Sequence, residues 1–268
     1  MTAATAAALL ALVCTTPARS AEPMQPIEKW NVDFGDAHCI ALRNYGSPAN
    51  PVRLGLKPSP IGDVMQVSVL RTAANKQVDQ FDGTLTLDRA SPRKVSILGY
   101  GSKSGKTRIS TINLPLSTFQ AIRGASSLRV RSPGEVDLAF ALSQMEPVAR
   151  ALDRCVAGLR KMWHLGEHSA AIKTEASLDK PLRKLFSSND YPGDAVIANA
   201  SGTVGLIMLI DETGKTASCM ITQASGRASL DAQSCAIIAT RGRFSPALGA
   251  DGKPIKSGTT GRINWKMP

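Results

Sequence analysis

Five cysteines occur in the 268 residues of this chain, and the four that follow Cys14 constrain its fold more than any other feature. No two of them form a Cys-x-x-Cys pair, so the spacing of a zinc ribbon or a thioredoxin-like redox motif is absent. In an exported protein, an even number of cysteines indicates disulfides rather than free thiols. Four cysteines allow three pairings, and the sequence alone leaves all three open. The domain organisation described below favours Cys39–Cys155 and Cys219–Cys235.

The amino terminus indicates export. Residues 3–13 are almost wholly Ala and Leu, a run too short for a membrane span of ~20 residues. The small residues around Ala18-Arg19-Ser20-Ala21 suit signal peptidase, so we expect residues 1–21 to be a cleaved signal peptide and the mature protein to be periplasmic. Val13 stands where a lipoprotein signal requires a small residue before Cys14, and membrane anchoring is expected only if the leader stays uncleaved.

Length and composition predict one large or two modest globular domains, at ~150 residues per domain. Aromatic residues make up only 4% of the chain, which argues against platforms that stack nucleic-acid bases. The net charge is +11, but its excess is divided: 19 basic against 13 acidic residues in 22–168, and 12 against 8 in 169–268. Because no dense basic run appears in either part, we expect no nucleic acid among the partners.

Residues 22–165 are predicted to form a β-rich domain, a sheet or barrel closed by one helix. Glu146 to Met162 has apolar residues at helical spacing, and a Cys39–Cys155 bridge would join this helix to an early strand. The turn dipeptides Gly35-Asp36 and Asp82-Gly83 are among those that separate short strands. The expected strands are Trp30–Phe34, Cys39–Tyr45, Val64–Leu70, Gly83–Leu87, Val95–Tyr100, Arg108–Ile112, Leu128–Arg131 and Val136–Leu142. Residues 166–188 are predicted to be a linker with one short helix near Leu182–Phe186.

The segment Gly101-Ser102-Lys103-Ser104-Gly105-Lys106-Thr107 superficially resembles a phosphate-binding loop. Such a loop needs a glycine five positions before Gly105, where this chain has Tyr100. The residues that follow alternate like a strand instead of opening a helix. We therefore expect a hairpin loop here.

His164-Leu165-Gly166-Glu167-His168 matches the H-x-x-E-H string of inverted zinc peptidases, in which two His bind zinc and the Glu acts as general base. Gly166 would weaken a helix by ~1 kcal/mol, and the apolar periodicity ends by Trp163. The string is better explained as a polar helix end, with Gly166 stopping the helix and His164 facing its dipole. We predict no metal site, no catalytic residue and no cofactor, and no nucleophile elbow accompanies the serines. No small-molecule substrate is identified.

Residues 189–268 have the clearest pattern: strand, strand, helix, strand. Thr203 to Ile210 is an apolar strand, Asp211-Glu212-Thr213-Gly214 is a turn, and Ala217 to Thr222 returns as the second strand of a hairpin. Ser229 is expected to cap a helix that contains Cys235, and residues 262–267 alternate as a third strand. This order predicts a three-stranded antiparallel sheet packed under one helix. The fold class of the whole chain is therefore α+β.

These residues resemble the C-terminal domain of TonB, the periplasmic end of the transducer that serves outer-membrane receptors. The resemblance covers about residues 189–268. It rests on Tyr191-Pro192-x-x-Ala195, Gly202-x-Val204, Asp211-x-x-Gly214, Ser225-Gly226, Leu230-Asp231 and Phe244-x-Pro246-Ala247. Cys219 and Cys235 are similar to a subset of the family with one cysteine on the second strand and one on the helix. A bridge there would close ~17 residues and contribute roughly 3 kcal/mol.

The remainder of the chain departs from a full transducer. A Pro-rich spacer and a membrane-spanning helix with a motor-contacting His would be expected, but the 16 prolines are scattered and a β-rich segment stands in the spacer's place. In that segment, Trp30-x-Val32, Cys39 and the late amphipathic helix resemble invasion-associated locus B proteins. That resemblance implies no function.

The TonB resemblance implies a non-enzymatic, exported protein-interaction module whose partners are envelope proteins, with TonB-dependent outer-membrane receptors as the family's example. Its last domain is expected to bind an extended peptide at an exposed sheet edge. The candidate edge is the final strand, with Thr260, Arg262, Asn264 and Lys266 facing outward. These four residues are equally compatible with a plain solvated face. The alternative is a periplasmic scaffold protein in which the β-rich domain binds the partner and the TonB-like domain is structural.

Overall fold

The computed structural model describes residues 22–74, 77–102 and 104–267, and it has an α+β fold with two separate hydrophobic cores. The predicted signal peptide, residues 1–21, lies outside the described residues. None of the helices in the described part of the chain is both long and apolar enough to cross a bilayer.

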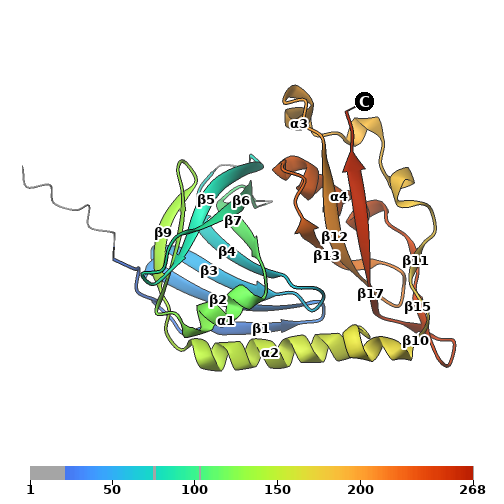
Figure 1. Ribbon diagram of the computed structural model, residues 1–268, viewed down its shortest axis with the longest axis horizontal. Helices are drawn as coiled ribbons and strands as arrows, with labels where there is room; N and C mark the ends of the chain where they lie inside the picture. Colours follow the sequence, from blue (N-terminus) through green and yellow to red (C-terminus); the bar gives the residue numbers. More distant parts are fainter. Residues whose placement is uncertain (1–21, 75–76, 103, 268) are drawn as a thin grey trace, which may run out of the picture.

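The first core lies within a strongly curved antiparallel sheet of nine strands, in the order β1-β2-β3-β4-β7-β6-β5-β8-β9 (Figure 1). The strands are β1 Asn31–Gly35, β2 His38–Ser47, β3 Asn50–Pro58, β4 Met65–Thr72, β5 Asp79–Leu87, β6 Arg93–Gly101, β7 Thr107–Leu114, β8 Ser127–Ser132 and β9 Val136–Ala141. The loop between β6 and β7 confirms that the phosphate-loop-like segment is a hairpin.

Residues 24–27 close this sheet into a barrel. Met24 exchanges main-chain hydrogen bonds with Ala139 and Ala141 of β9, at 2.7 and 3.0 Å. The amide of Ile27 donates to the carbonyl of Asn44 in β2, at 3.0 Å. Because this short segment pairs with both strands, it joins the last strand of the sheet to the second, and we call the assembly the barrel.

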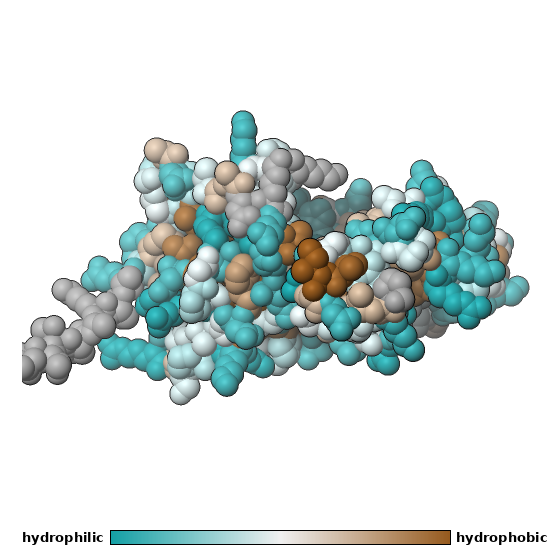
Figure 2. Space-filling model, turned by 90° about the horizontal axis from the view of Figure 1, so that it is seen from above, coloured by the Kyte–Doolittle hydropathy of each residue, from teal (hydrophilic) through white to brown (hydrophobic). Residues whose placement is uncertain are grey.

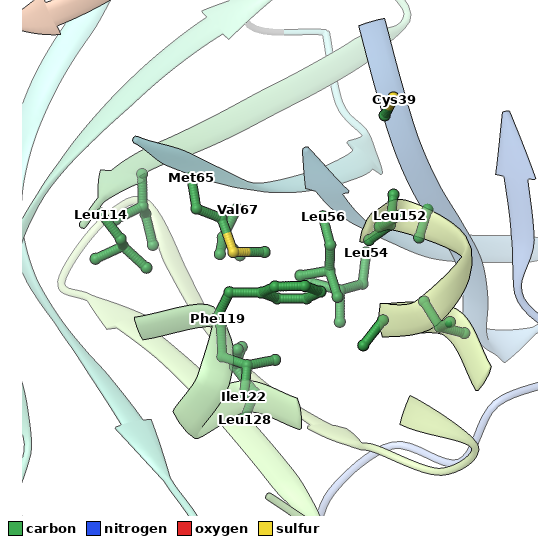
Figure 3. Close-up of a cluster of buried hydrophobic side chains, with 14 of the residues drawn as sticks. Cys39, Leu54, Leu56, Met65, Val67, Leu114, Phe119, Ile122, Leu128 and Leu152 are labelled. Atoms are coloured by element: carbon green, nitrogen blue, oxygen red, sulfur yellow. The ribbon is translucent and has the colours of Figure 1, made fainter. Parts of the chain in front are cut away.

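Two helices complete the barrel core. Helix α1 (Ser117–Gly124) places Phe119 among the core side chains of β3 and β4 (Figure 3), and its Ile122 is also fully buried. Helix α2 (Met145–Met162) packs its apolar face on the sheet and is joined to β2 by the Cys39–Cys155 disulfide. The amphipathic helix predicted from Glu146 to Met162 is therefore present.

Strand β3 and helix α1 were not predicted. In β3, Pro51 and Pro58 make the segment read as a loop, but each pairs at an end of the strand, opposite Gly46 and Met65. Between them, Leu54 and Leu56 are buried, whereas Arg53 is exposed and Lys57 is half-buried. This alternation is the pattern of a strand with one face in the core. A proline at the end of a strand costs little ladder hydrogen bonding, which is why the element survives.

The second core belongs to a three-stranded antiparallel sheet in the order β13-β12-β17, with helix α4 on one face. These elements are β12 Gly202–Ile210, β13 Thr216–Gln223, α4 Ala228–Arg241 and β17 Ser257–Trp265. This is the predicted arrangement, and a Cys219–Cys235 disulfide joins β13 to α4. The predicted cap was wrong: α4 begins at Ala228, and the Ser229 hydroxyl donates instead to Asp194, at 2.9 Å.

The segment expected as a linker, residues 166–188, has secondary structure that pairs with the C-terminal domain. It contains β10 Ile172–Thr174, which pairs with β15 Ala247–Gly249, and β11 Ser177–Leu178, which pairs with β14 Phe244–Ser245. The remaining short elements are the 3₁₀ turns η1 Gly166–Ala171, η2 Leu182–Leu185 and η3 Ser188–Asp190, helix α3 Gly193–Ile197 and strand β16 Pro254–Ile255.

Strand β12 explains how the two parts of the molecule meet. Its side chains are buried from Val204 to Ile210, and they divide between two faces. Val204 and Leu206 pack in the core under α4, whereas Leu209 packs in the barrel core. A strand covered on both faces needs a continuous apolar run, which is what the sequence has at this position.

Candidate functional edge strand

The C-terminal sheet has two edge strands, β13 and β17 (Figure 1). Ile61 of the barrel packs against Gly258 at the start of β17, so the candidate part of this strand is its later half, residues 262–266. The side-chain amide of Asn113, on β7 of the barrel, donates a hydrogen bond to the main-chain carbonyl of Ile221 in β13, at 3.0 Å. Strand β17 pairs with β12 and with no other strand among the described residues. An edge strand with an open side presents unpaired main-chain groups, so β17 is the candidate functional element.

The four residues predicted for this edge are all exposed, but the structure does not bring them to one place. Arg262, Asn264 and Lys266 line a groove beside the end of β17. Thr260 lines a different hollow near the start of the strand. Asn264 is partly held by its neighbour strand, because its Oδ1 accepts a hydrogen bond from the Thr203 hydroxyl, at 2.8 Å.

The groove beside the end of β17, which we call the β17 groove, has a volume of ≈ 440 Å³. It lies between residues 262–266 and the segment 182–191. Side chains from both faces of β17 line it, the exposed Arg262 as well as the buried Trp265. A groove reached from both faces of a strand runs along the edge of that strand, which is where an added strand would pair.

Three basic side chains and three aromatic rings dominate the lining. The cations are Arg183, Arg262 and Lys266, and the described lining residues include no carboxylate. The rings are those of Phe186, Tyr191 and Trp265. The groove is therefore positively charged, and aromatic rings form its floor.

Trp265 contacts both other aromatic rings of the groove. The rings of Phe186 and Tyr191 meet it edge to face, at centroid distances of 5.3 and 5.2 Å. Its Nε1 donates to the Ser234 hydroxyl of α4, at 2.9 Å, and only 6% of its surface is exposed. These contacts hold the end of β17 and the segment 186–191 in one arrangement.

An ion pair fixes the outer wall of the groove to α4. Both guanidinium Nη atoms of Arg241 donate to the Asp190 carboxylate, at 2.7 and 2.6 Å, and one of them also donates to the Leu185 carbonyl. The hydrogen bonds from Arg241 hold the pKa of Asp190 well below its usual range. Asp190 also accepts hydrogen bonds from the Ser187 amide and hydroxyl, so the turn before Tyr191 is closed by side chains.

Sequence reasoning missed Arg183 and Phe186, because the segment 166–188 has little periodicity and was interpreted as a linker. The signal that could have identified it is the spacing of Leu182, Leu185 and Phe186 at i, i+3 and i+4, with two basic residues between the first and the second. Both Leu185 and Phe186 pack into the C-terminal core. Only their pairing partners, far along the chain, show that this segment belongs to the groove.

The H-x-x-E-H string does not lie on a helix. Helix α2 ends at Met162, His164 has a positive φ of 49°, and Glu167 and His168 belong to the 3₁₀ turn η1. The Nδ1 of His164 is hydrogen-bonded with the Lys256 carbonyl, at 2.8 Å. In the part of the chain that the structure describes, no three His, Cys, Asp or Glu side chains gather closely enough to hold a metal ion.

Comparison with protein families identifies the family of the C-terminal domain. Residues 187–267 match the sequence model of the family described as Gram-negative bacterial TonB protein C-terminal. This segment is a TonB C-terminal domain. The family consists of non-enzymatic interaction domains of the cell envelope, and the match covers the sheet, α4 and most of the β17 groove. No curated protein matches the chain.

Proposed function

We propose that this protein is a periplasmic, non-enzymatic adaptor whose TonB C-terminal domain binds an extended peptide from an envelope partner by adding it as a strand to β17. The observation that carries the proposal is the open edge of β17, which lies beside the β17 groove while the barrel lies against β13. Partners of this kind include the amino-terminal segments of TonB-dependent outer-membrane receptors.

Strand addition suits this site because the main-chain hydrogen bonds do not depend on the sequence of the bound peptide. The main-chain hydrogen bonds provide affinity, and the side chains beside the strand provide specificity. Here those side chains are Arg183, Arg262 and Lys266, so peptides without basic residues at that end bind best. The aromatic rings of the groove provide a rigid apolar surface for one peptide side chain.

Titration calorimetry of the mature chain with synthetic receptor amino-terminal peptides tests the proposal. Arg183→Glu and Arg262→Glu are expected to weaken binding about tenfold each, as removal of a charged contact does. Lys184→Glu is the matched control, because Lys184 is the exposed neighbour of Arg183 but does not line the groove. Absence of binding at about 1 mM peptide, the weak end of specific recognition, would overturn the proposal.

The same variants separate this reading from the scaffold alternative. If the barrel binds the partner and the C-terminal domain is structural, pull-down of envelope proteins by the whole chain will not change with Arg183→Glu or Arg262→Glu. Loss of capture with these two variants, and retention with Lys184→Glu, supports the β17 site.

A further inference from the structure

The end of β17 offers two different surfaces, because successive residues of a strand point to opposite faces of its sheet. Ile263 and Trp265 are buried on the face that α4 covers. Arg262, Asn264 and Lys266 alternate with them and are exposed on the opposite face, which we call the outer face. A peptide added to β17 therefore has its side chains divided between these two surfaces, and its sequence must suit both.

On the α4 face, the surface beside β17 is apolar. Leu182 lies next to Gly261, since a Cβ at Gly261 would be 3.5 Å from the Leu182 Cδ2. The half-buried rings of Phe186 and Tyr191 come next, and both contact Trp265. All of these residues except Gly261 line the β17 groove. The α4 side of a bound peptide would rest on these three side chains.

The polar atoms of these rings are already used. The Tyr191 hydroxyl donates to the Ala200 carbonyl, and the Trp265 Nε1 donates to the Ser234 hydroxyl. A polar peptide side chain placed here would lose its hydration without gaining a partner, which is unfavourable. The floor of the groove therefore selects apolar side chains.

The outer face has positive charges that no acidic residue balances. Arg262 and Lys266 make no ion pair and no side-chain hydrogen bond with any residue that the structure describes, and the same is true of Arg183 across the groove. Asp190 does not neutralise them, because Arg241 occupies both of its carboxylate oxygens. An acidic peptide side chain on this face would gain attraction from these cations.

The register of a paired strand turns these two surfaces into a sequence pattern. Side chains directly opposite each other on paired strands share a face, with Cβ atoms about 5 Å apart. The peptide positions opposite Arg262 and Lys266 are therefore acidic, and those opposite Ile263 and Trp265 are apolar. The position between them faces Asn264, whose Oδ1 accepts the Thr203 hydroxyl and whose amide remains a donor, so a polar residue suits it.

A second copy of this chain is a poor occupant for the same edge. Antiparallel pairing of two β17 strands would place Arg262 of one copy beside Lys266 of the other, and like charges directly opposite each other are destabilising. Figure 1 places the end of β17 at the top of the molecule, and Figure 2 shows that this side is mostly hydrophilic, with only small hydrophobic areas. Charge complementarity thus favours an acidic partner.

We propose that the partner peptide has the alternating order acidic, apolar, polar, apolar, acidic along the part that pairs with residues 262–266. This inference rests on strand addition at β17, and it adds the chemistry of the partner to that proposed function. The order is the same read in either direction, so it holds for parallel and antiparallel addition alike.

Short peptides with identical flanks and different centres test the pattern by titration calorimetry with the mature chain. The alternating centre is Glu-Leu-Thr-Leu-Glu. A blocked centre, Glu-Glu-Leu-Leu-Thr, has the same composition and charge but places one Glu and one Leu on each face. The neutral centre is Gln-Leu-Thr-Leu-Gln, and the basic centre is Lys-Leu-Thr-Leu-Lys.

We expect the alternating peptide to bind at least about tenfold more tightly than the blocked peptide, because only the alternating peptide buries both Leu side chains on the aromatic floor. The neutral peptide is expected to bind severalfold more weakly than the alternating peptide at low salt, and the basic peptide about tenfold more weakly. Equal affinities for the alternating and blocked peptides, or for the acidic and neutral ones, would overturn the proposal.

A charge exchange locates the preference on the outer face. The double variant Arg262→Glu/Lys266→Glu is expected to bind the basic peptide more tightly than the alternating acidic one, whereas a merely structural role of these cations would weaken all peptides alike. Lys161→Glu/Lys173→Glu is the matched control, since both lysines are exposed and lie outside the groove. It should retain the preference for the acidic peptide. A double variant at Arg262 and Lys266 that still prefers the acidic peptide would contradict the pattern.

Receptor amino-terminal peptides, measured in the same series, separate this proposal from strand addition itself. If they bind and lose affinity with Arg262→Glu, while the alternating and blocked peptides bind equally, strand addition stands and the pattern is wrong. If no peptide binds, both are wrong.

Discussion

Asn113 of the barrel holds the main-chain carbonyl of Ile221, 108 residues later in the chain, through a hydrogen bond of 3.0 Å. The bond anchors the barrel against the β13 edge of the TonB C-terminal domain. Among the described strands, β13 and β17 each pair only with β12, so it is this hydrogen bond from the barrel to the main chain of β13 that makes the two edges unequal.

Removal of the Asn113 amide tests the contact between the domains. Asn113→Ala leaves the Ile221 carbonyl without its donor, and we expect a loss of about 1 kcal/mol in the free energy of unfolding. Hydrogen exchange of the β13 amides should accelerate at the same time, because the strand is less well held. Urea unfolding and exchange mass spectrometry measure the two effects. Unchanged exchange in β13 would show that the Asn113 contact does not hold this edge.

Gly214 is predicted to be intolerant of any side chain. Its φ is +75°, and a Cβ at this position would lie 1.8 Å from the main-chain oxygen of Phe244. Gly214→Ala therefore combines a left-handed backbone with a direct clash, and we expect it to cost more than about 2 kcal/mol. Gly252→Ala is the control, since Gly252 also has a positive φ but open space around it. Equal melting temperatures for the two variants would contradict this reading.

The Asp190–Arg241 ion pair predicts a loss of stability in acid. Arg241 depresses the pKa of Asp190 in the folded protein, so the pair stabilises fully above the unfolded-state pKa of about 4. As the pH falls below 4 towards the folded-state pKa, this contribution is lost. In Asp190→Asn the stability at pH 7 is lower by about 1–2 kcal/mol, and the part of the decline between pH 4 and 2 due to Asp190 disappears. Denaturant unfolding across this pH range measures both quantities.

The two disulfides are predicted to stabilise different parts of the protein. Replacing Cys219 and Cys235 with Ala removes a bridge between residues with a sequence separation of 16. In the chain-entropy model, this lowers the free energy of unfolding by about 3 kcal/mol. Cys39 and Cys155 are 116 residues apart, and their replacement is expected to cost more, about 4–5 kcal/mol. Proteolysis with mapped cleavage sites should show earlier cutting in the C-terminal domain for the first pair and in the barrel for the second.

The features that sequence predicted well depend on neighbouring residues. Asp211 illustrates this, because its Oδ1 accepts the amides of Thr213 and Lys215, so the turn chemistry is complete within five residues. The apolar run of β12 and the helical spacing of α2 are similarly visible along the chain. The family of the last domain followed from such local signals and their spacing.

The features that sequence missed depend on distant partners. Pro51 and Pro58 look like strand breakers until β2 and β4 are seen to place them at the ends of β3. Ser229 looks like a helix cap until Asp194 is seen to accept its hydroxyl. Leu182 to Phe186 looks like a linker until Trp265 is seen to pack against Phe186.

By itself, the sequence determined the α+β class, the hairpin, helix and strand of the TonB C-terminal domain, and the alternation that marks β17 as a surface strand. Only the tertiary structure decided which edge lies open beside a groove and which edge meets the barrel. The physical reason is that main-chain groups of β13 and β17 are alike, and an edge is closed only by groups that approach it in space. Here the group that approaches is the amide of Asn113, and its position relative to Ile221 is set by the packing of two domains.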